Sequence, residues 1–532
     1  MIGKPIEDCR VSLRREDVLR EIGSVTEWDI IIVGGGATGL GAAVEAASRG
    51  YKTLLLEAYD FAKGTSSRST KLVHGGVRYL QQGNVKLVLE ALRERGRLLR
   101  NAPHLAHRLA FIIPAYASWE LPFYGIGLTL YDFLAGRQGL GHSRVLAADT
   151  VKRELPTGRR DSLKGGILYY DGQFDDARLA VTLMRTLFDL GGTALNYAPV
   201  HSLRKTGGRV SGVLAQDKET GSILDLSAKT VINATGVFAD GIRQMDEPEA
   251  QAVVTASQGS HFVLDRSFLP ATSGLMIPRT SDGRVLFAIP WHESVVVGTT
   301  DDPVPQPDLE PQAMRDEKQF LIAHIERFLG RRPRPEDVLS MWSGQRPLVR
   351  QQGASNTAAI SRDHTVLISQ SKLITIVGGK WTTYRKMGED VIDHAAQIAS
   401  LKSVASRTKE LRLHGAMDRP ESDNEWQRVY GADLPLLNRM AELDPELDAF
   451  LHPALPFRRV EVIWAARHEM ARQLEDVLAR RTRALFLNAR ASLEAAPLAA
   501  KLLARELGRD LQWEREQVSE YAHLAEQYIW KQ

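Results

Sequence analysis

Three glycines near the N-terminus have the spacing that binds nucleotide phosphates. Gly34, Gly36 and Gly39 follow the β-branched run Trp28–Val33 and precede a helix-like segment, Leu40–Arg49. In this pattern the first glycine makes a tight turn, the second lets the backbone approach a pyrophosphate, and the third allows close packing of helix on strand. The N–H groups and the dipole at the start of the helix would then favour the phosphates.

An acidic residue stands where a ribose would need it. Glu57 lies 21 residues beyond Gly36, at the end of a second apolar run, Thr53–Leu56. A carboxylate there accepts a hydrogen bond from a ribose 2′-OH and disfavours the 2′-phosphate of NADP. The motif therefore predicts a dinucleotide site, and the alternative is a glycine-rich turn that binds nothing.

A second small-residue turn favours FAD over NAD. The strand-like segment Thr230–Asn233 runs into Ala234, Thr235 and Gly236. Flavoproteins return to their cofactor in this way, although such a turn on its own is equally well explained as structural. After Glu57 comes a polar loop that could line the pyrophosphate and the flavin ring, or could simply be flexible. Its candidate cofactor-binding residues are Thr65, Ser66, Ser67, Lys71, His74, Gly75 and Gly76.

Several segments together resemble the FAD-dependent, quinone-linked glycerol-3-phosphate dehydrogenases. The matching motifs occur in family order over roughly residues 29–385, and the helical tail resembles the family's C-terminal domain more loosely. These motifs are Ser66-Ser67, KLVHGGVRYL from Lys71, DDARL from Asp175, GSH from Gly259, GTTD from Gly298, SGQRPL from Ser343 and GGKWTTYR from Gly378. The resemblance implies oxidation of sn-glycerol 3-phosphate to dihydroxyacetone phosphate, with hydride transfer from C2 to FAD and electrons passed on to a membrane quinone.

The resemblance also implies a cationic pocket for the substrate phosphate, which the planar fork of arginine suits. Its candidate substrate-binding residues are Arg78, Tyr79, His261, Arg346, Arg362 and Lys380. The candidate catalytic residues are His261, Arg346 and Lys380. An ordinary histidine pKa of about 6.5 leaves His261 largely neutral at pH 7, as a base for the C2 hydroxyl requires. Arg346 or Lys380 could instead stabilise the developing alkoxide. Any one of these residues could also be a surface charge or a structural side chain.

One further segment is expected at the flavin, and one position departs from the family pattern. Gly379, Lys380, Trp381 and Thr382 are expected to bring backbone N–H groups to the pyrimidine end of the ring, with a helix beginning near Thr383. Gln258 stands where some members of the family have lysine. If that charge assists phosphate binding, affinity here would be weaker.

The elements that must position these residues predict an α/β fold. We expect a Rossmann-like FAD-binding domain with an inserted antiparallel-sheet substrate domain, followed by a C-terminal all-helical domain. The first unit would span residues 1–400, with inserted segments at roughly 100–165 and 240–345, and the second 401–532. Helices are predicted at Asn84–Arg100, Asp175–Leu190 and Val462–Arg480. The inserted sheet is predicted from Val200–Val231, His261–Leu264, Val285–Ile289 and Val295–Gly298.

The composition of the chain argues against several classes of function and site. The 532 residues carry a net charge of only +3, which gives no argument for nucleic acid. The single cysteine, Cys9, cannot form an internal disulfide, which points to a reducing compartment, and no Cys/His spacing suggests a metal. The N-terminus does not read as a signal peptide, and no 18-residue apolar run predicts a spanning helix.

An aromatic run leaves the membrane question open. Trp119–Leu134 is expected either to pack in the core or to present an apolar face to a bilayer or quinone. The resemblance implies a cytoplasmic enzyme attached peripherally to the cytoplasmic membrane, and a family-typical homodimer. Two rival functions are an oxidase that passes electrons to O2 and releases hydrogen peroxide, and a flavin-binding module without catalysis. The oxidases carry an extra insertion that this sequence lacks, and the module would not need a cationic pocket.

Overall fold

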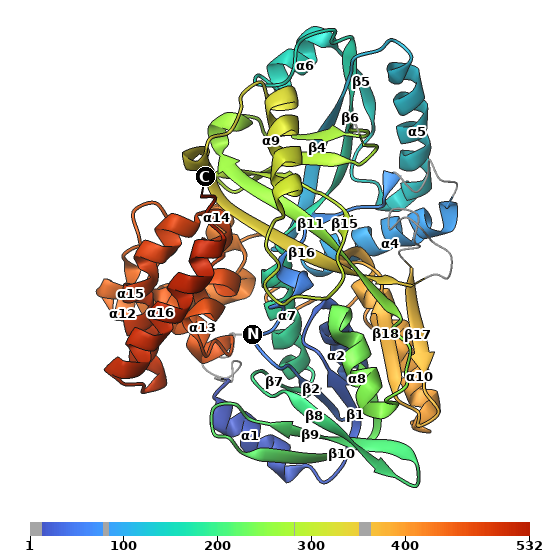
Figure 1. The fold of residues 1–532 in the computed structure, drawn as a ribbon, viewed down its shortest axis with the longest axis vertical. Helices are drawn as coiled ribbons and strands as arrows, with labels where there is room; N and C mark the ends of the chain where they lie inside the picture. Colours follow the sequence, from blue (N-terminus) through green and yellow to red (C-terminus); the bar gives the residue numbers. More distant parts are fainter. Residues whose placement is uncertain (1–12, 78–83, 281, 351–362, 532) are drawn as a thin grey trace, which may run out of the picture.

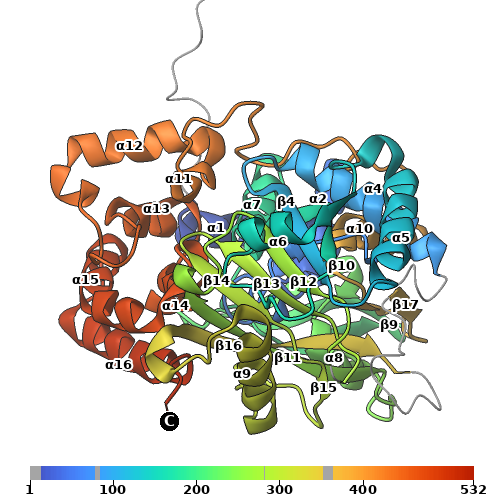
Figure 2. The ribbon, with the colours of Figure 1, turned by 90° about the horizontal axis from the view of Figure 1, so that it is seen from above.

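The computed structural model describes residues 13–77, 84–280, 282–350 and 363–531. Two sheets with their covering helices form an elongated body, and the C-terminal helices pack along one side of it (Figures 1 and 2). The first sheet lies at the lower end of Figure 1 and the second at the upper end. The observed fold agrees with the predicted class.

The first sheet has a parallel core in the order β18-β10-β1-β2-β7, with β17 antiparallel at one edge. Its central strands are β-branched and leucine-rich, as expected of strands covered on both faces. The predicted strands Trp28–Val33 and Thr53–Leu56 are confirmed as β1 and β2. The bounds are β1 Trp28–Val33, β2 Thr53–Leu56, β7 Thr193–Leu195, β10 Ile223–Asn233, β17 His364–Ile368 and β18 Ile374–Gly378.

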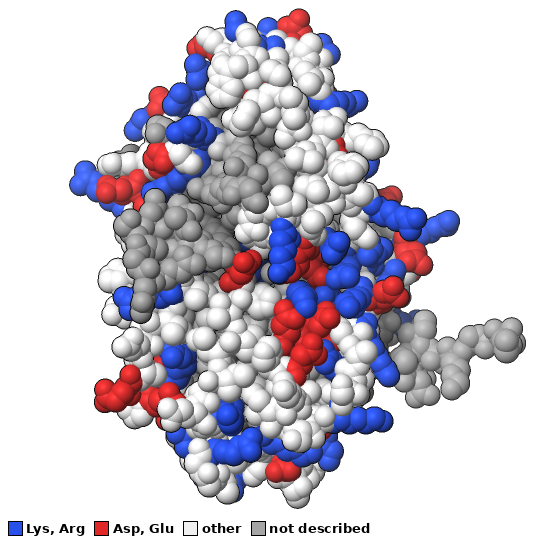
Figure 3. Space-filling model, turned by 90° about the vertical axis from the view of Figure 1, so that its right-hand side faces the viewer, with Lys and Arg blue, Asp and Glu red and all other residues white. Residues whose placement is uncertain are grey.

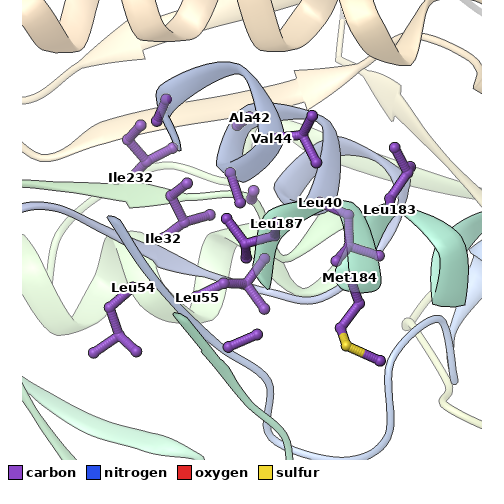
Figure 4. Packing of buried hydrophobic residues seen from close by; sticks show 14 of the residues in the cluster. Ile32, Leu40, Ala42, Val44, Leu54, Leu55, Leu183, Met184, Leu187 and Ile232 are labelled. Atoms are coloured by element: carbon purple, nitrogen blue, oxygen red, sulfur yellow. The ribbon is translucent and has the colours of Figure 1, made fainter. Parts of the chain in front are cut away.

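Helices cover this sheet and bury its apolar side chains. Figure 4 shows Leu40 and Val44 of α2 with Leu183 and Leu187 of α7, beside Ile32 and its neighbours on the strands. The predicted helices are confirmed in α4, capped by Asn84, and in α7, whose N-cap Asp175 accepts the N–H of Arg178. The bounds are α1 Arg15–Ser24, α2 Ala37–Ser48, α4 Val85–Asn101, α7 Asp176–Asp189, α8 Ala239–Asp246 and α10 Tyr384–Ile398.

The second sheet is largely antiparallel, in the order β15-β11-β14-β13-β12-β4-β6-β3, with β16 on β11 and β5 on β6. It has its own apolar layer beneath α6 and α9. Its strands are β3 Leu72–Val73, β4 Ala106–Ala115, β5 Arg144–Ala147, β6 Gly165–Phe174, β11 Val254–Asp265, β12 Gly274–Ile277, β13 Leu286–Trp291, β14 Ser294–Gly298, β15 Asp302–Pro303 and β16 Val338–Val349. Its helices are α5 Glu120–Ala135, α6 Ala148–Glu154 and α9 Arg315–Leu329.

Two predictions about these elements are wrong. The segment Val200–Val231 does not join the second sheet: β8 (Val200–Thr206) and β9 (Arg209–Gln216) form a hairpin that extends the first sheet through β10. Alternation alone predicts a strand but not its partner, because pairing depends on distant segments. The helix predicted at Val462–Arg480 ends at His468, and the chain turns away at Met470, which has φ +55°; Asp476 then accepts the N–H groups of Arg472 and Gln473 at the start of a new turn.

The C-terminal domain is helical, as predicted. Its helices enclose an apolar core around the fully buried Trp464, and that core continues into side chains of the second sheet. The bounds are α11 Glu425–Arg428, α12 Leu434–Leu443, α13 Val460–His468, the π-helical turn η11 Asp476–Arg481, α14 Ala484–Leu487, α15 Ala489–Leu507 and α16 Leu511–Gln527.

Candidate active site

A cavity of about 870 Å³ lies where the two sheets meet. The carboxyl ends of β1, β2, β10 and β18 open into it from the first sheet, and β11 and β16 form a wall from the second. This is where open parallel sheets bind ligands, and the volume is in the upper range for small-molecule sites.

The glycine motif forms a close backbone cradle at one end of the cavity. Gly34 has φ +111°, and a Cβ there would lie 2.6 Å from the carbonyl oxygen of Ala234. A Cβ on Gly39 would overlap the carbonyl of Gly34, so this glycine serves strand–helix packing rather than the lining. Gly36 is the N-cap of α2 and lines the cavity. A phosphate can therefore approach the bare helix N-terminus.

Glu57 is fixed at the cavity wall by two backbone groups. Its carboxylate oxygens accept the N–H of Gly35 at 2.6 Å and that of Tyr59 at 2.8 Å. Burial raises the pKa of this carboxyl, while the two N–H groups oppose the shift. The cradle and the adjacent acceptor fit the pyrophosphate and ribose of a dinucleotide.

Part of the polar loop after Glu57 lines the cavity. Thr65, Ser66, His74 and Gly76 do so, together with Ala234, Thr235, Gly236, Gly379, Lys380, Trp381 and Thr382 from the other two predicted segments. The Ser66 hydroxyl accepts the N–H of Ala37 at 2.9 Å, and the Trp381 indole N–H donates to the Ser66 carbonyl at 2.9 Å. Three sequence-distant segments thus converge on one ligand-sized space, as a cofactor longer than a mononucleotide requires.

Three predicted cofactor residues lie behind this lining. Ser67 is buried, and the N–H of Gly75 donates to the Tyr131 hydroxyl at 2.9 Å. Lys71 is fully buried and its ammonium contacts Asp176 at 2.7 Å, with the rings of Trp291, Trp342 and Phe486 around it. Burial lowers the Lys71 pKa to about 7 although Asp176 opposes the shift. Lys71 is therefore placed to support the loop rather than to contact a ligand.

His261 lines the same cavity from β11. Its Nε2 lies 2.9 Å from the Thr70 hydroxyl, and its ring stacks on Trp342 with centroids 5.2 Å apart. Within the described residues Nδ1 has no hydrogen-bond partner. Burial, with the nearby positive charges of Arg346 and Lys71, holds the pKa of this imidazole well below its ordinary value. His261 is therefore neutral at pH 7 and able to accept a proton.

Arg346 extends from β16 into the cavity beside β11. One guanidinium nitrogen contacts the Asp301 carboxylate at 3.2 Å, and the other donates to the Thr299 hydroxyl at 3.2 Å. Ser257 of β11 is its register partner, and a Cβ on Gly259 would meet the guanidinium. Arg346, His261 and Lys380 thus share one cavity. The other predicted substrate residues, Arg78, Tyr79 and Arg362, lie outside the described residues.

The structure adds residues that the sequence reading missed. Thr70 belongs to the hydroxyl-rich loop, whose composition indicated a segment that lines a ligand site. The contact between Thr70 and His261 could not be predicted from the sequence. Arg284 lines the cavity and forms a bidentate pair with Asp302 at 2.7 and 2.9 Å. Gln258 is buried beneath the wall and donates to Glu317 at 2.8 Å. It does not line the cavity, so the expected loss of phosphate affinity at this position has no structural basis.

The aromatic run forms α5, and much of it is exposed. Phe133 is 79% exposed and Ile126 73%, and Trp119, Phe123 and Leu130 are exposed as well, so that of the two alternatives for this run, packing in the core is wrong for most of its apolar side chains. Leu128 and Tyr131 face inward. A groove of about 640 Å³ runs between α5 and β5. Figure 3 views the side that carries α5 and shows an uncharged expanse bordered by Lys and Arg. In the described part of the chain, no helix is long and apolar enough to cross a membrane.

Comparison with protein-family models matches almost the whole chain. Residues 29–385 match the family described as FAD dependent oxidoreductase, and residues 369–517 match the C-terminal domain of alpha-glycerophosphate oxidase. The first of these matches alone covers well over half of the sequence.

Curated proteins and solved structures give consistent results. The chain is 40% identical to a mitochondrial glycerol-3-phosphate dehydrogenase of Homo sapiens, over 97% of this chain and 75% of the relative. It is 36% identical to the SDP6 mitochondrial enzyme of the same name from Arabidopsis thaliana, over 99% and 90%. A glycerol-3-phosphate dehydrogenase from Bacillus halodurans, solved with FAD, superposes with a TM-score of 0.79 at 27% identity, over 97% of each chain.

Proposed function

The chain belongs to the FAD-dependent oxidoreductase family, with FAD as its cofactor, and from that premise we propose that it oxidises sn-glycerol 3-phosphate to dihydroxyacetone phosphate. One observation supports this most strongly: His261, Arg346 and Lys380 line the cavity that the glycine cradle opens into. A proton acceptor and two cations beside a dinucleotide site match a substrate with one secondary alcohol and one phosphate.

The cationic side chains bind the phosphate end of the substrate. Arg346 presents a planar guanidinium whose partners, Asp301 and Thr299, fix its orientation before the substrate arrives. Lys380 adds a second positive charge from the N-cap of the turn Trp381–Thr383. The pairing with a carboxylate orients the Arg346 guanidinium in advance. The substrate phosphate therefore meets a donor of fixed orientation and not a mobile side chain.

His261 takes the hydroxyl proton. We assign this to Nε2, because its partner Thr70 lines the cavity, whereas Nδ1 is enclosed. As the C2 hydroxyl loses its proton to Nε2, the C2–H bond breaks, and its electron pair leaves with the hydrogen as hydride. When bound, FAD supplies the two-electron acceptor for that hydride. Arg346 or Lys380 stabilises the negative charge that develops on the C2 oxygen.

A membrane quinone is the proposed final acceptor, reached at the apolar face of α5. Exposed aromatic and aliphatic side chains there, with basic residues around them, suit peripheral attachment to an anionic bilayer surface. We place the protein on the cytoplasmic face of the cytoplasmic membrane. A homodimer remains an expectation from the family resemblance.

A steady-state assay separates this function from the oxidase. Purified enzyme is given glycerol 3-phosphate with a short-chain quinone, and quinone reduction and peroxide release are followed together. The proposal expects quinone reduction far faster than peroxide release, with dihydroxyacetone phosphate as product. Peroxide formed in step with substrate consumption, whether or not quinone is present, would establish the oxidase instead.

A further inference from the structure

The loop Asp60–Lys71 contacts both the cofactor cavity and the C-terminal domain. Toward the cavity it presents Gly64, Thr65 and Ser66. Several of its residues, Asp60 and Lys63 among them, contact the C-terminal domain, which begins more than 300 residues later in the sequence. The loop contains only one short helical turn, Thr65–Ser67. Its conformation therefore depends on contacts with the segments that pack against it on the side away from the cavity.

Two consecutive arginines of the C-terminal domain hold the start of the loop. Arg481 donates to both oxygens of Asp60, at 2.6 and 2.9 Å, and Arg480 donates to the same carboxylate. All three side chains are buried. Arg480 also contacts Glu475 and Asp476, and Arg481 donates to the carbonyl of Glu469. Both arginines that neutralise the Asp60 carboxylate belong to η11, and Asn196 of the FAD-binding domain also donates to this carboxylate at 3.4 Å. Burial raises the pKa of the Asp60 carboxyl, but the charges and hydrogen bonds of Arg481 and Arg480 lower it further, so that its pKa falls to about 2.

Arg483 of the same domain contacts the later part of the loop directly at Ser67 and indirectly through Asp176 of α7. Arg483 donates to the Ser67 carbonyl at 3.2 Å and to Asp176 at 3.0 Å. Asp176 in turn accepts from the N–H and hydroxyl of Ser69 and from Lys71. Nearer the cavity, Lys63 pairs with Glu475 at 2.5 Å. These contacts hold Lys63, Ser67, Ser69 and Lys71, which lie one to five residues from Thr65 or Ser66.

We propose that the turn Arg480–Arg483 is a positioning device for FAD: the C-terminal domain determines cofactor affinity by holding the loop Asp60–Lys71 against the cofactor cavity. This inference rests on the assignment of Thr65 and Ser66 to the cofactor site. Buried ion pairs contribute little net stability but fix geometry, because breaking one strands a charge. A loop released from the domain must be ordered again when FAD binds, which weakens affinity. By reciprocity, FAD stabilises the docking of the domain.

The test measures FAD release from the purified holoenzyme, followed by the rise in flavin fluorescence without any substrate. Because no substrate is present, the result is independent of whether glycerol 3-phosphate is the substrate. Arg481→Gln should accelerate release by about 5- to 150-fold, the range of typical coupling between sites. Arg481→Lys, which keeps the charge, should restore part of the loss. Asp60→Asn keeps the side-chain shape and should also accelerate release, which gives a second reading if Arg481→Gln folds poorly.

Arg178→Gln is the matched control. Arg178 forms a similarly buried, bidentate pair with the Glu469 carboxylate across the same domain interface, at 2.7 and 2.8 Å, but among the described residues no hydrogen bond or ion pair joins Arg178 to the loop. The variant Arg178→Gln should lower the melting temperature as Arg481→Gln does, but it should leave the rate of FAD release unchanged. If both variants accelerate release equally, or if folded Asp60→Asn and Arg481→Gln both retain FAD like the parent, the proposal is overturned.

Discussion

The hydroxyl of Tyr131 accepts the backbone N–H of Gly75 at 2.9 Å and donates to Asp171 at 3.0 Å. Tyr131 belongs to the inner face of α5, whose outer face carries the exposed apolar side chains, whereas Gly75 precedes the cavity-lining Gly76. Arg95 completes the group through a 2.7 Å contact with Asp171. The helix proposed to meet the membrane is therefore hydrogen-bonded directly to the loop beside the cofactor cavity.

Removing the Tyr131 hydroxyl should destabilise the segment around Gly75. Tyr131→Phe leaves the Gly75 N–H and one Asp171 oxygen buried without that partner, at a cost of about 1–3 kcal/mol in the free energy of unfolding. Urea unfolding measures the cost, and flavin fluorescence shows whether FAD release also accelerates. Tyr51→Phe, which removes a hydroxyl bonded to the Lys402 carbonyl away from the cavity, is the control. If FAD is released at the same rate from Tyr131→Phe and Tyr51→Phe, Tyr131 does not support the segment around Gly75 beside the cofactor cavity.

Arg346 should contribute mainly to substrate binding. Arg346→Ala is expected to raise KM and to lower kcat/KM by the equivalent of about 2–5 kcal/mol, because it removes an oriented phosphate donor and the guanidinium that pairs with Asp301. Steady-state kinetics over a range of substrate concentrations measure both constants. Arg204→Ala removes a surface pair with Asp225 and should change neither. An unchanged KM in Arg346→Ala would remove this residue from the phosphate site.

His261 should set the rate of the oxidation step and not its pH dependence near neutrality. His261→Ala is expected to slow substrate-driven flavin reduction about 10²- to 10⁴-fold. Burial and Arg346 hold the pKa of His261 well below 6.5, and the base must be neutral to act. The parent rate should therefore stay level from pH 8 down through about 6.5 and fall only in more acidic solution. Rapid-mixing absorbance measures both effects, and a loss under tenfold would assign the proton to another group.

The apolar face of α5 should bind lipid. Phe133→Asp places a charge at the most exposed aromatic side chain of the helix and should abolish most sedimentation with vesicles that contain anionic lipid. Activity toward a water-soluble acceptor should remain. Ile223→Asp introduces the same charge at an exposed apolar residue of β10 and should leave sedimentation unchanged. Vesicle binding that persists in Phe133→Asp would place the membrane surface elsewhere.

Local patterns predicted much of this molecule because their causes are local. The turn at Gly34 and the strand before it follow from backbone freedom and apolar periodicity, and both are found where expected. Lys71 shows the limit: its motif suggested the cofactor, but the side chain is committed to Asp176, more than 100 residues away. The Arg481–Asp60 pair spans more than 400 residues, and nothing in either local sequence indicates it. Exposure of α5 likewise depends on which neighbours cover it.

The most direct test is an anaerobic titration of the purified flavoprotein with glycerol 3-phosphate, followed through the visible absorption band of the flavin. A proton acceptor and an oriented guanidinium beside the cofactor predict that this band bleaches with the appearance of one dihydroxyacetone phosphate per flavin. Glycerol, which has the same secondary alcohol without the phosphate, should bleach it far more slowly. A band unchanged by glycerol 3-phosphate, in protein that still holds FAD, would contradict the proposed reaction.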